Sequence, residues 1–318
     1  MKDYIILDEM PELAQDFLKH IISIKKYSKT TTKEYFYDLR IFFKFIKVKK
    51  LKLNISMSII KINDLDLSFI ESINENDLTD YIFYLTNQNL NSLTILRKIS
   101  SLKSFFKYLT FKRRLLKINP AAELETPKLP KRLPKYLTLD ESKSLLHSID
   151  GEFKERDFAI ITLFLNCGLR LSELIKININ DVNKDVLNIV GKGNKERQVY
   201  LNNACKSAIS SYILVRPKNN LKDRDALFIT KRGTRISSRS IELMVKKYLK
   251  SSDLDSKKFS PHKLRHTAAT LMHKYGNVDI KSLQQILGHE SIKTTEIYTH
   301  IDNEDVKIAL DKNPLNNI

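Results

Sequence analysis

Residues 119–134, NPAAELETPKLPKRLP, decide how this chain is organised. The four prolines in this stretch lack backbone N–H donors and push the residues before them toward extended conformations. A helix or a central strand cannot run through it. Thr138 and Glu141 then form the Thr-x-x-Glu pattern of a helical capping box, which opens a new folded unit. The sequence predicts a first domain over residues 1–117, a linker over 118–136 and a second domain over 137–318.

The first domain is expected to be a small helical bundle. Apolar residues recur at three- and four-residue spacing, as in Leu13, Phe17 and Ile21, and the pattern continues to residue 109. The last helix leaves basic side chains for its outer face. Such side chains either contact phosphates or only solvate the surface, and both interpretations stay open. The candidate phosphate contacts of this domain are Lys98, Lys103, Lys107, Arg113 and Arg114.

The composition favours a polyanionic partner. The 318 residues include 55 Lys and Arg against 37 Asp and Glu, a formal net charge of +18 at pH 7. Nucleic acid is the leading candidate, although charge alone also allows an acidic membrane. The sequence has no apolar run of about eighteen residues and no signal-peptide pattern, so a cytoplasmic protein is expected. Cys167 and Cys205 fit no metal-ligand spacing, and we expect both to be reduced and structural.

The second domain is predicted to be mainly helical with a small sheet. Short β-rich runs at Val186–Val190 and 198–201 flank a basic, glycine-containing tip at 191–195, which predicts a β-hairpin. Residues 227–229 are a candidate third strand. The expected fold is therefore mainly α with a small β-hairpin or three-stranded sheet, in two domains that form a clamp.

Two arginines of the second domain are suited to bind one anion. Arg170 comes just beyond Gly168, which suits a helix end, and Glu173 lies three residues on and can orient the guanidinium. By itself this segment is more often a surface ion pair.

A second helix supplies the other arginine. The helix that Pro261 opens carries His262 and Arg265 at i and i+3, so both emerge on one face, whereas His266 is expected to point elsewhere. Paired guanidinium forks match the planar oxygens of a phosphate better than ammonium groups do. Arg170 and Arg265 together therefore suit a phosphate in transition.

A proton donor and a nucleophile complete the set. Lys192 lies on the hairpin tip between two glycines and can reach to protonate a leaving oxygen, with Lys195 as a rival. Tyr298 follows His289 nine residues later. A phenol with a pKa near 10 needs positive charge or a base beside it to attack at neutral pH, and His289 and the two arginines could supply this. Each residue alone also has a plainer explanation, a solvated turn for Lys192 and a core or surface position for Tyr298.

No cofactor is expected. The sequence has no Walker-type glycine loop, no HExxH motif and no Cys/His cluster, and Asp181 with Asp185 lacks the surroundings of a two-metal site. If DNA strands are rejoined without ATP, the bond energy must be kept in a link between protein and DNA. This demand favours a protein nucleophile with cationic stabilisers.

The motifs and their order resemble those of the tyrosine recombinases, and within that family the Xer-like and related integrases. Over residues 137–301 the resemblance is specific, and over the first 117 residues it is only general, to a helical core-binding domain. The matching motifs are GLRLSEL at 168–174, GKGNKER at 191–197, HKLRHT at 262–267, LGH at 287–289 and IYTH at 297–300.

The resemblance implies a role for each matched residue. Tyr298 would attack the scissile phosphate, Arg170 and Arg265 would hold its oxygens, and Lys192 would protonate the departing 5′ hydroxyl. His262 would assist proton transfer, His289 would hydrogen-bond the phosphate, and Glu173 would support the site from behind, with Lys195 a further DNA contact.

The resemblance also implies partners. They are double-stranded DNA with inverted-repeat half-sites, and three further copies of the chain or of a paralogous recombinase in a tetramer that exchanges strands through a Holliday junction. In the tetramer the segment after Tyr298 would dock on a neighbouring subunit. A septal DNA translocase is a further partner, as expected for a protein of chromosome partition and cell division.

Three alternatives remain open. An integrase or excisionase of a phage or mobile element would share the chemistry, although the helix signals that begin by about Glu12 leave no room for an additional arm-binding domain. A type IB topoisomerase also uses a tyrosine and two arginines and would relax supercoils without recombination. A non-catalytic DNA-binding regulator could use the same bundle and basic surface, and would tolerate the loss of Tyr298.

Overall fold

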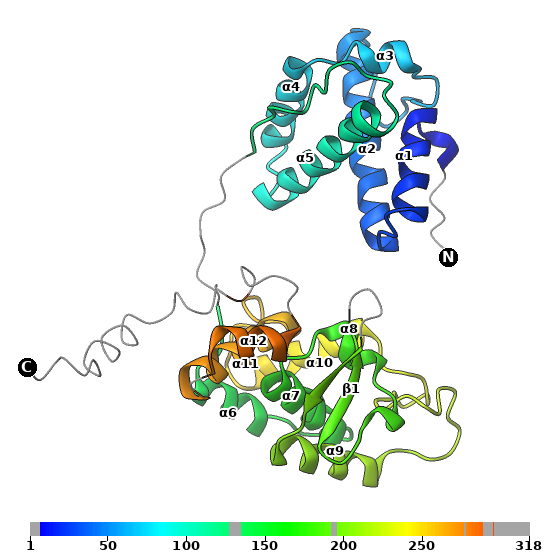
Figure 1. Ribbon diagram of the computed structural model, residues 1–318. Coiled ribbons are helices and arrows are strands. Elements are labelled where there is room, and N and C mark those ends of the chain that lie inside the picture. Colours follow the sequence, from blue (N-terminus) through cyan, green and yellow to red (C-terminus); the bar gives the residue numbers. More distant parts are fainter. Residues whose placement is uncertain (1–6, 127–134, 192–195, 277, 289–294, 296–318) are drawn as a thin grey trace, which may run out of the picture. The chain divides into compact units, whose positions relative to one another are not determined.

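The computed structural model describes residues 7–126, 135–191, 196–276, 278–288 and 295 (Figure 1). The chain divides into two compact units, Met1–Lys131 and Arg132–Ile318. The domain and linker boundaries drawn from the sequence stay predictions. Ala121 and Leu124, which the sequence assigns to the linker, are buried in the core of the first unit. Within the described ranges, no helix is both long and apolar enough to cross a membrane.

The first unit is a helical bundle, as the apolar spacing predicted. Its helices bury a core rich in aromatic rings, in which Phe105 packs edge-on against both Phe17 and Phe43. Each such ring removes a large apolar area from water, which stabilises the bundle. The elements are η1 (Leu7–Glu9), α1 (Glu12–Ser23), α2 (Lys29–Lys50), α3 (Leu67–Glu71), α4 (Glu75–Asn87), α5 (Ser92–Lys107) and the single π-turn η2 (Tyr108–Lys112).

Lys98, which was expected on the outer face of α5, is buried instead. The expectation that it is available to DNA was wrong, because the side chain is only 7% exposed and its Nζ lies 2.9 Å from Asp38 Oδ1. Asp38 is itself buried on α2, and Arg97 also pairs with it. A buried carboxylate needs a cationic partner. Lys98 therefore neutralises a charge inside the bundle.

The second unit surrounds one central helix, α7. This helix is apolar on nearly all sides and packs against α9 and α11, which is the environment that such a helix requires. The elements are α6 (Leu139–His147), α7 (Lys154–Cys167), α8 (Leu171–Lys176), η3 (Ile179–Asp181), β1 (Val186–Val190), β2 (Glu196–Tyr200), α9 (Asn203–Val215), α10 (Ser238–Ser251), α11 (Pro261–Gly276) and α12 (Ile280–Leu287).

The predicted hairpin is present, with a second strand that begins two residues earlier than expected. Strands β1 and β2 are antiparallel and pair Val186 with Tyr200 and Val190 with Glu196. The candidate third strand is absent. Residues 227–229 form no strand, and the described part of this sheet has two strands. Instead, Ala226 and Ile229 form isolated bridges with Asn178 and Arg235, and the Arg216 guanidinium binds the carbonyls of residues 226 and 227.

Local signals at helix ends are confirmed. Thr138 and Glu141 form the reciprocal capping box of α6, and Pro261 is the first residue of α11. Gly168 and Gly288 end α7 and α12 in the left-handed backbone conformation, with φ of 57° and 64°, which residues other than glycine rarely adopt. These two turns position the segments that carry the candidate site.

Candidate active site

Arg170 stands at the start of α8, immediately after the turn at Gly168. Glu173 accepts a hydrogen bond from the Arg170 backbone N–H at 2.8 Å and from its guanidinium Nη1 at 2.7 Å. The contact expected from the sequence is therefore present. It anchors one side of the guanidinium, while 35% of the Arg170 side chain remains exposed.

Glu173 is the centre of a larger cluster. Its carboxylate is 1% exposed and also faces Arg197 Nη2 at 3.1 Å and Arg265 Nη1 at 3.7 Å. Burial alone would raise the pKa of Glu173, but the backbone N–H of Arg170 and the charge of Arg197 outweigh burial, so the pKa lies below its usual value. Among the described residues, three guanidinium groups thus share one carboxylate, an excess of positive charge that favours an anion.

The same three arginines hold the end of α12. Its last carbonyls have no partner within the helix and carry the negative end of the helix dipole. Arg197 Nη1 donates to the carbonyl of residue 286 at 2.6 Å, Arg265 Nη2 to that of residue 287 at 2.6 Å, and Arg170 Nη2 to that of Gly288 at 3.0 Å. The cluster therefore fixes the position from which the chain continues toward residue 289.

Arg265 is almost fully enclosed. Its side chain is 3% exposed, and Nη1 also donates to the carbonyl of Gly168 at 2.5 Å. Arg265 joins the end of α7 to the end of α12.

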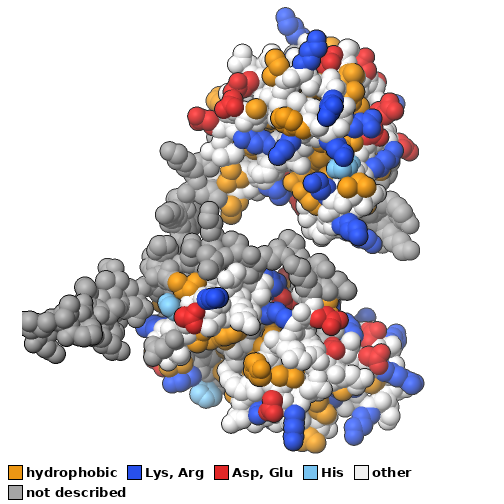
Figure 2. Space-filling model, in the orientation of Figure 1, with side chains coloured by type: hydrophobic (Ala, Val, Ile, Leu, Met, Phe, Trp, Pro, Cys, Tyr) orange, Lys and Arg blue, Asp and Glu red, His pale blue; other side chains and the backbone are white. Residues whose placement is uncertain are grey.

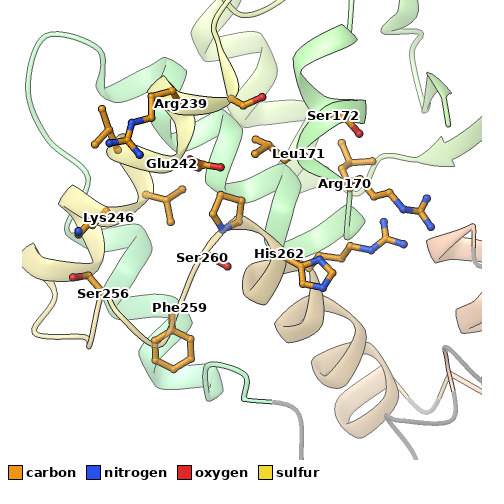
Figure 3. Close-up of a pocket in the computed structure, with 16 residues that line it drawn as sticks. Arg170, Leu171, Ser172, Arg239, Glu242, Lys246, Ser256, Phe259, Ser260 and His262 are labelled. Atoms are coloured by element: carbon orange, nitrogen blue, oxygen red, sulfur yellow. The ribbon is translucent and has the colours of Figure 1, made fainter. Parts of the chain in front are cut away.

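His262 lies on the first turn of α11 and lines the same cavity as Arg170 and Arg265. Figure 3 shows His262 and Arg170 extending on one side of this cavity. Partial burial lowers the pKa of His262, and the neighbouring positive charges, Arg265 first, lower it further. The neutral imidazole is therefore favoured near pH 7.

His266 was expected to point away from the site; it does not line the cavity, but its ring contacts that of His262. Its Nε2 lies 3.1 Å from Nε2 of His262, one helical turn away. Only one of the two facing nitrogens can carry a hydrogen in such a contact. One of the two rings therefore donates a hydrogen bond to the other.

The cavity between α8, α10 and the start of α11 has a volume of about 660 Å³. Its far wall, on α10, carries Arg239, Glu242 and Lys246 (Figure 3). The sequence reasoning passed over these three residues, although their spacing of three and four positions places them on one polar face of an amphipathic helix. The cavity is lined with charge on both sides.

Arg197 also belongs to the site and was not identified from the sequence. It lies two residues before the buried Val199 on β2, so both side chains are on the same, inward face of the strand. A charged residue at an apolar position of a strand was the signal that could have identified it. By contrast, Lys192, Lys195, His289 and Tyr298 lie outside the described residues.

The candidate DNA contacts on the first unit differ in exposure. Lys107, Arg113 and Arg114 are exposed, Lys103 is partly buried, and Arg113 pairs with Asp16 at 3.3 Å. Lys103 and Lys107 line a second cavity of about 640 Å³, on α1, α2 and α5. On the face of each unit visible in Figure 2, basic and acidic side chains are interspersed.

Comparison with known proteins defines the class. Residues 135–305 match the Phage integrase family, and residues 57–113 match the phage integrase N-terminal SAM-like domain. The first match alone spans more than half of the chain. The chain belongs to the phage integrase family and is a tyrosine recombinase.

Full-length relatives narrow this class to a Xer-like site-specific recombinase. The chain is 52% identical to tyrosine recombinase XerC of Caldanaerobacter subterraneus subsp. tengcongensis, covering 96% of this chain and 87% of that protein. It is 34% identical to tyrosine recombinase XerC of Thermodesulfovibrio yellowstonii, over 93% and 94% of the two chains. The likeness thus extends across both units.

Solved structures have the same fold. The crystal structure of XerA recombinase is 29% identical, with coverage of 95% and 97% and a TM-score of 0.51. XerH bound to its difH substrate before cleavage is 23% identical, with coverage of 94% and 84% and a TM-score of 0.68.

Proposed function

We propose that the cluster around Glu173 binds the scissile phosphate of a DNA site, which Tyr298 attacks. The observation that carries this proposal is the excess of positive charge where Arg170, Arg197 and Arg265 share one buried carboxylate beside His262. A phosphodiester gains negative charge on its non-bridging oxygens during displacement. Preorganised guanidinium groups in a partly enclosed site stabilise that charge.

The proposed reaction balances without metal or nucleotide. Tyr298 gives its phenol proton to neutral His262 and its oxygen forms a bond to phosphorus, while the bond from phosphorus to the 5′ oxygen breaks and Lys192 gives that oxygen its proton. The product is a 3′-phosphotyrosine link and a free 5′ hydroxyl. Attack by another 5′ hydroxyl reverses the step and joins new strands. His262 in its neutral form assists proton transfer, and His289 hydrogen-bonds the phosphate.

The biological role follows from the Xer-like class. The proposed substrate is double-stranded DNA with inverted-repeat half-sites, cut by four copies of the chain, or by two with two of a paralogue, during resolution of chromosome or plasmid dimers. Such a reaction takes place in the cytoplasm, and a septal translocase would bring two sites together. Structures similar to this one were solved with DNA substrates, which supports the choice of substrate.

The test is covalent capture. Purified protein is incubated with nicked, labelled DNA from its own genome and analysed on a denaturing gel, beside Tyr298→Phe and beside Tyr275→Phe as a matched control. Tyr275 is an exposed tyrosine at the end of α11. We expect a protein-linked band for the wild type and for Tyr275→Phe, and none for Tyr298→Phe.

Two outcomes would contradict the proposal. A band that persists in Tyr298→Phe would assign the nucleophile to another residue. Intact binding of DNA with no band in any protein, even with added paralogue, would favour a DNA-binding regulator. Sequencing of the captured DNA separates a chromosomal resolution site from the ends of a mobile element.

A further inference from the structure

Arg197 differs from the other two arginines of the cluster. Arg170 and Arg265 line the cavity, whereas Arg197 does not and lies behind Glu173 and the end of α12. Its side chain is 18% exposed, and its guanidinium joins two elements distant in sequence. Nη2 donates to Glu173 on α8, and Nη1 donates to the carbonyl of residue 286 on α12.

Gly288 packs directly against this guanidinium. A Cβ atom built on Gly288 would lie 2.8 Å from Arg197 Nε, closer than ordinary contact allows. The left-handed turn that ends α12 therefore rests on Arg197. Because residue 289 follows this turn, the position of Arg197 bears on the segment that carries His289 and Tyr298.

Arg197 also changes what Arg170 can do. Glu173 is ionised and buried, and a buried carboxylate attracts every guanidinium within reach. Arg197 donates to Oε2 of Glu173, and the side chain of Arg170 donates only to Oε1. The other terminal nitrogen of Arg170, which lines the cavity, donates to the carbonyl of Gly288.

We infer that Arg197 is a positioning residue for strand cleavage, which keeps Arg170 available to the phosphate by occupying Glu173 and holding the last turn of α12. This inference rests on the proposed function of the cluster. Arg197 acts through Arg170 and α12, and touches no reacting atom. Loss of Arg197 would draw Arg170 toward Glu173 and loosen the turn at Gly288.

The experiment compares two substrates. One carries the natural scissile phosphate, and in the other a methyl group replaces one non-bridging oxygen, so the reacting group has no charge for an arginine to neutralise. The rate of covalent capture is measured on both for the wild type, Arg197→Gln and Arg197→Lys, with DNA affinity and thermal midpoint measured in parallel. Each variant is assayed at a temperature at which it is folded.

Arg216→Gln is the matched control. Arg216 is another buried arginine of the second unit and donates to the carbonyls of residues 226 and 227, away from α12 and Glu173. Its loss removes comparable backbone contacts and leaves the cluster intact. Once folded, this variant should cleave both substrates at close to the wild-type rate.

For Arg197→Gln we expect DNA affinity within about threefold of wild type and cleavage of the natural phosphate reduced on the order of 100-fold, as for a displaced catalytic group. The loss should be at least about tenfold smaller on the uncharged substrate, because the misplaced arginine no longer matters there. Arg197→Lys keeps the charge but cannot bridge both partners, so its loss should be intermediate. If Arg197→Gln does not fold, the lysine variant carries the same comparison.

An equal loss on both substrates would overturn the inference, because it would show that Arg197 only supports the fold. Loss of DNA affinity that accounts for the whole effect would also overturn it. If the wild type forms no covalent link with the natural phosphate, the proposed function fails first, and the inference fails with it.

Discussion

Replacement of Glu173 by glutamine tests whether one carboxylate holds the cluster together. Gln has the same shape, and its amide oxygen can still accept the Arg170 backbone N–H, but it has no charge. Arg197 and Arg265 would then remain largely buried without their shared anion, at 18% and 3% exposure. Breaking a buried pair from one side costs roughly 3–5 kcal/mol. We take the lower end, about 3 kcal/mol, because the capping bond is kept.

The assay is calorimetric unfolding of the full chain at pH 7. For a unit of this size, about 3 kcal/mol corresponds to a fall of roughly 6–12 °C in the unfolding midpoint of the second unit. Glu196→Gln is the control, because Glu196 is an exposed neighbour on β2. Its midpoint should stay within the range of an ordinary surface change, about 0.5 kcal/mol.

The effect depends on pH with a defined sign. The pKa of Glu173 in the folded chain lies below the usual value of 4.5. Its stabilising contribution is therefore fully present above pH 4.5 and is lost as pH falls through the lower, folded pKa. The difference between wild type and Glu173→Gln should be largest near neutrality and shrink in acid. A midpoint equal to that of Glu196→Gln at pH 7 would refute the reasoning.

Two further substitutions test the packing. Lys98→Met should lower the unfolding free energy of the first unit by about 2 kcal/mol, because Asp38 loses one of two cationic partners. Lys107→Met, the control at an exposed lysine, should change this free energy by less than about 0.5 kcal/mol. Equal denaturant midpoints for the two variants would contradict the burial of Lys98. Gly168→Ala should cost about 1–2 kcal/mol, because φ is 57° and the new Cβ would lie 2.7 Å from Leu287 Cδ2; unchanged thermal stability would show that the turn is not strained.

Much of the fold was predictable because the signals are local. Thr138 with Glu141, Pro261 at the start of α11 and the glycines after α7 and α12 act within one helical turn, so residue type alone determines them. The third strand was not predictable in this way. Residues 227–229 have strand composition, but their backbone groups bind the Arg216 side chain and the backbone of Ile177 and Ile236, which the composition of the run does not reveal.

The candidate site also has a part that short local motifs predict and a part that they do not. Arg170, Glu173, His262 and Arg265 could be chosen by spacing and chemistry, since each motif is short. Their roles, with those of Lys192, His289 and Tyr298, remain proposals.

From the sequence by itself, the prolines predict two domains, the glycines and capping residues determine the helix ends, and the order of five motifs identifies the family. Only the tertiary structure decided that Arg197 belongs to the cluster, that Lys98 is buried, and that three arginines hold the consecutive carbonyls of residues 286–288 at the end of α12. These facts depend on contacts between residues up to 118 positions apart. Local patterns cannot encode such contacts, because packing alone brings the partners together.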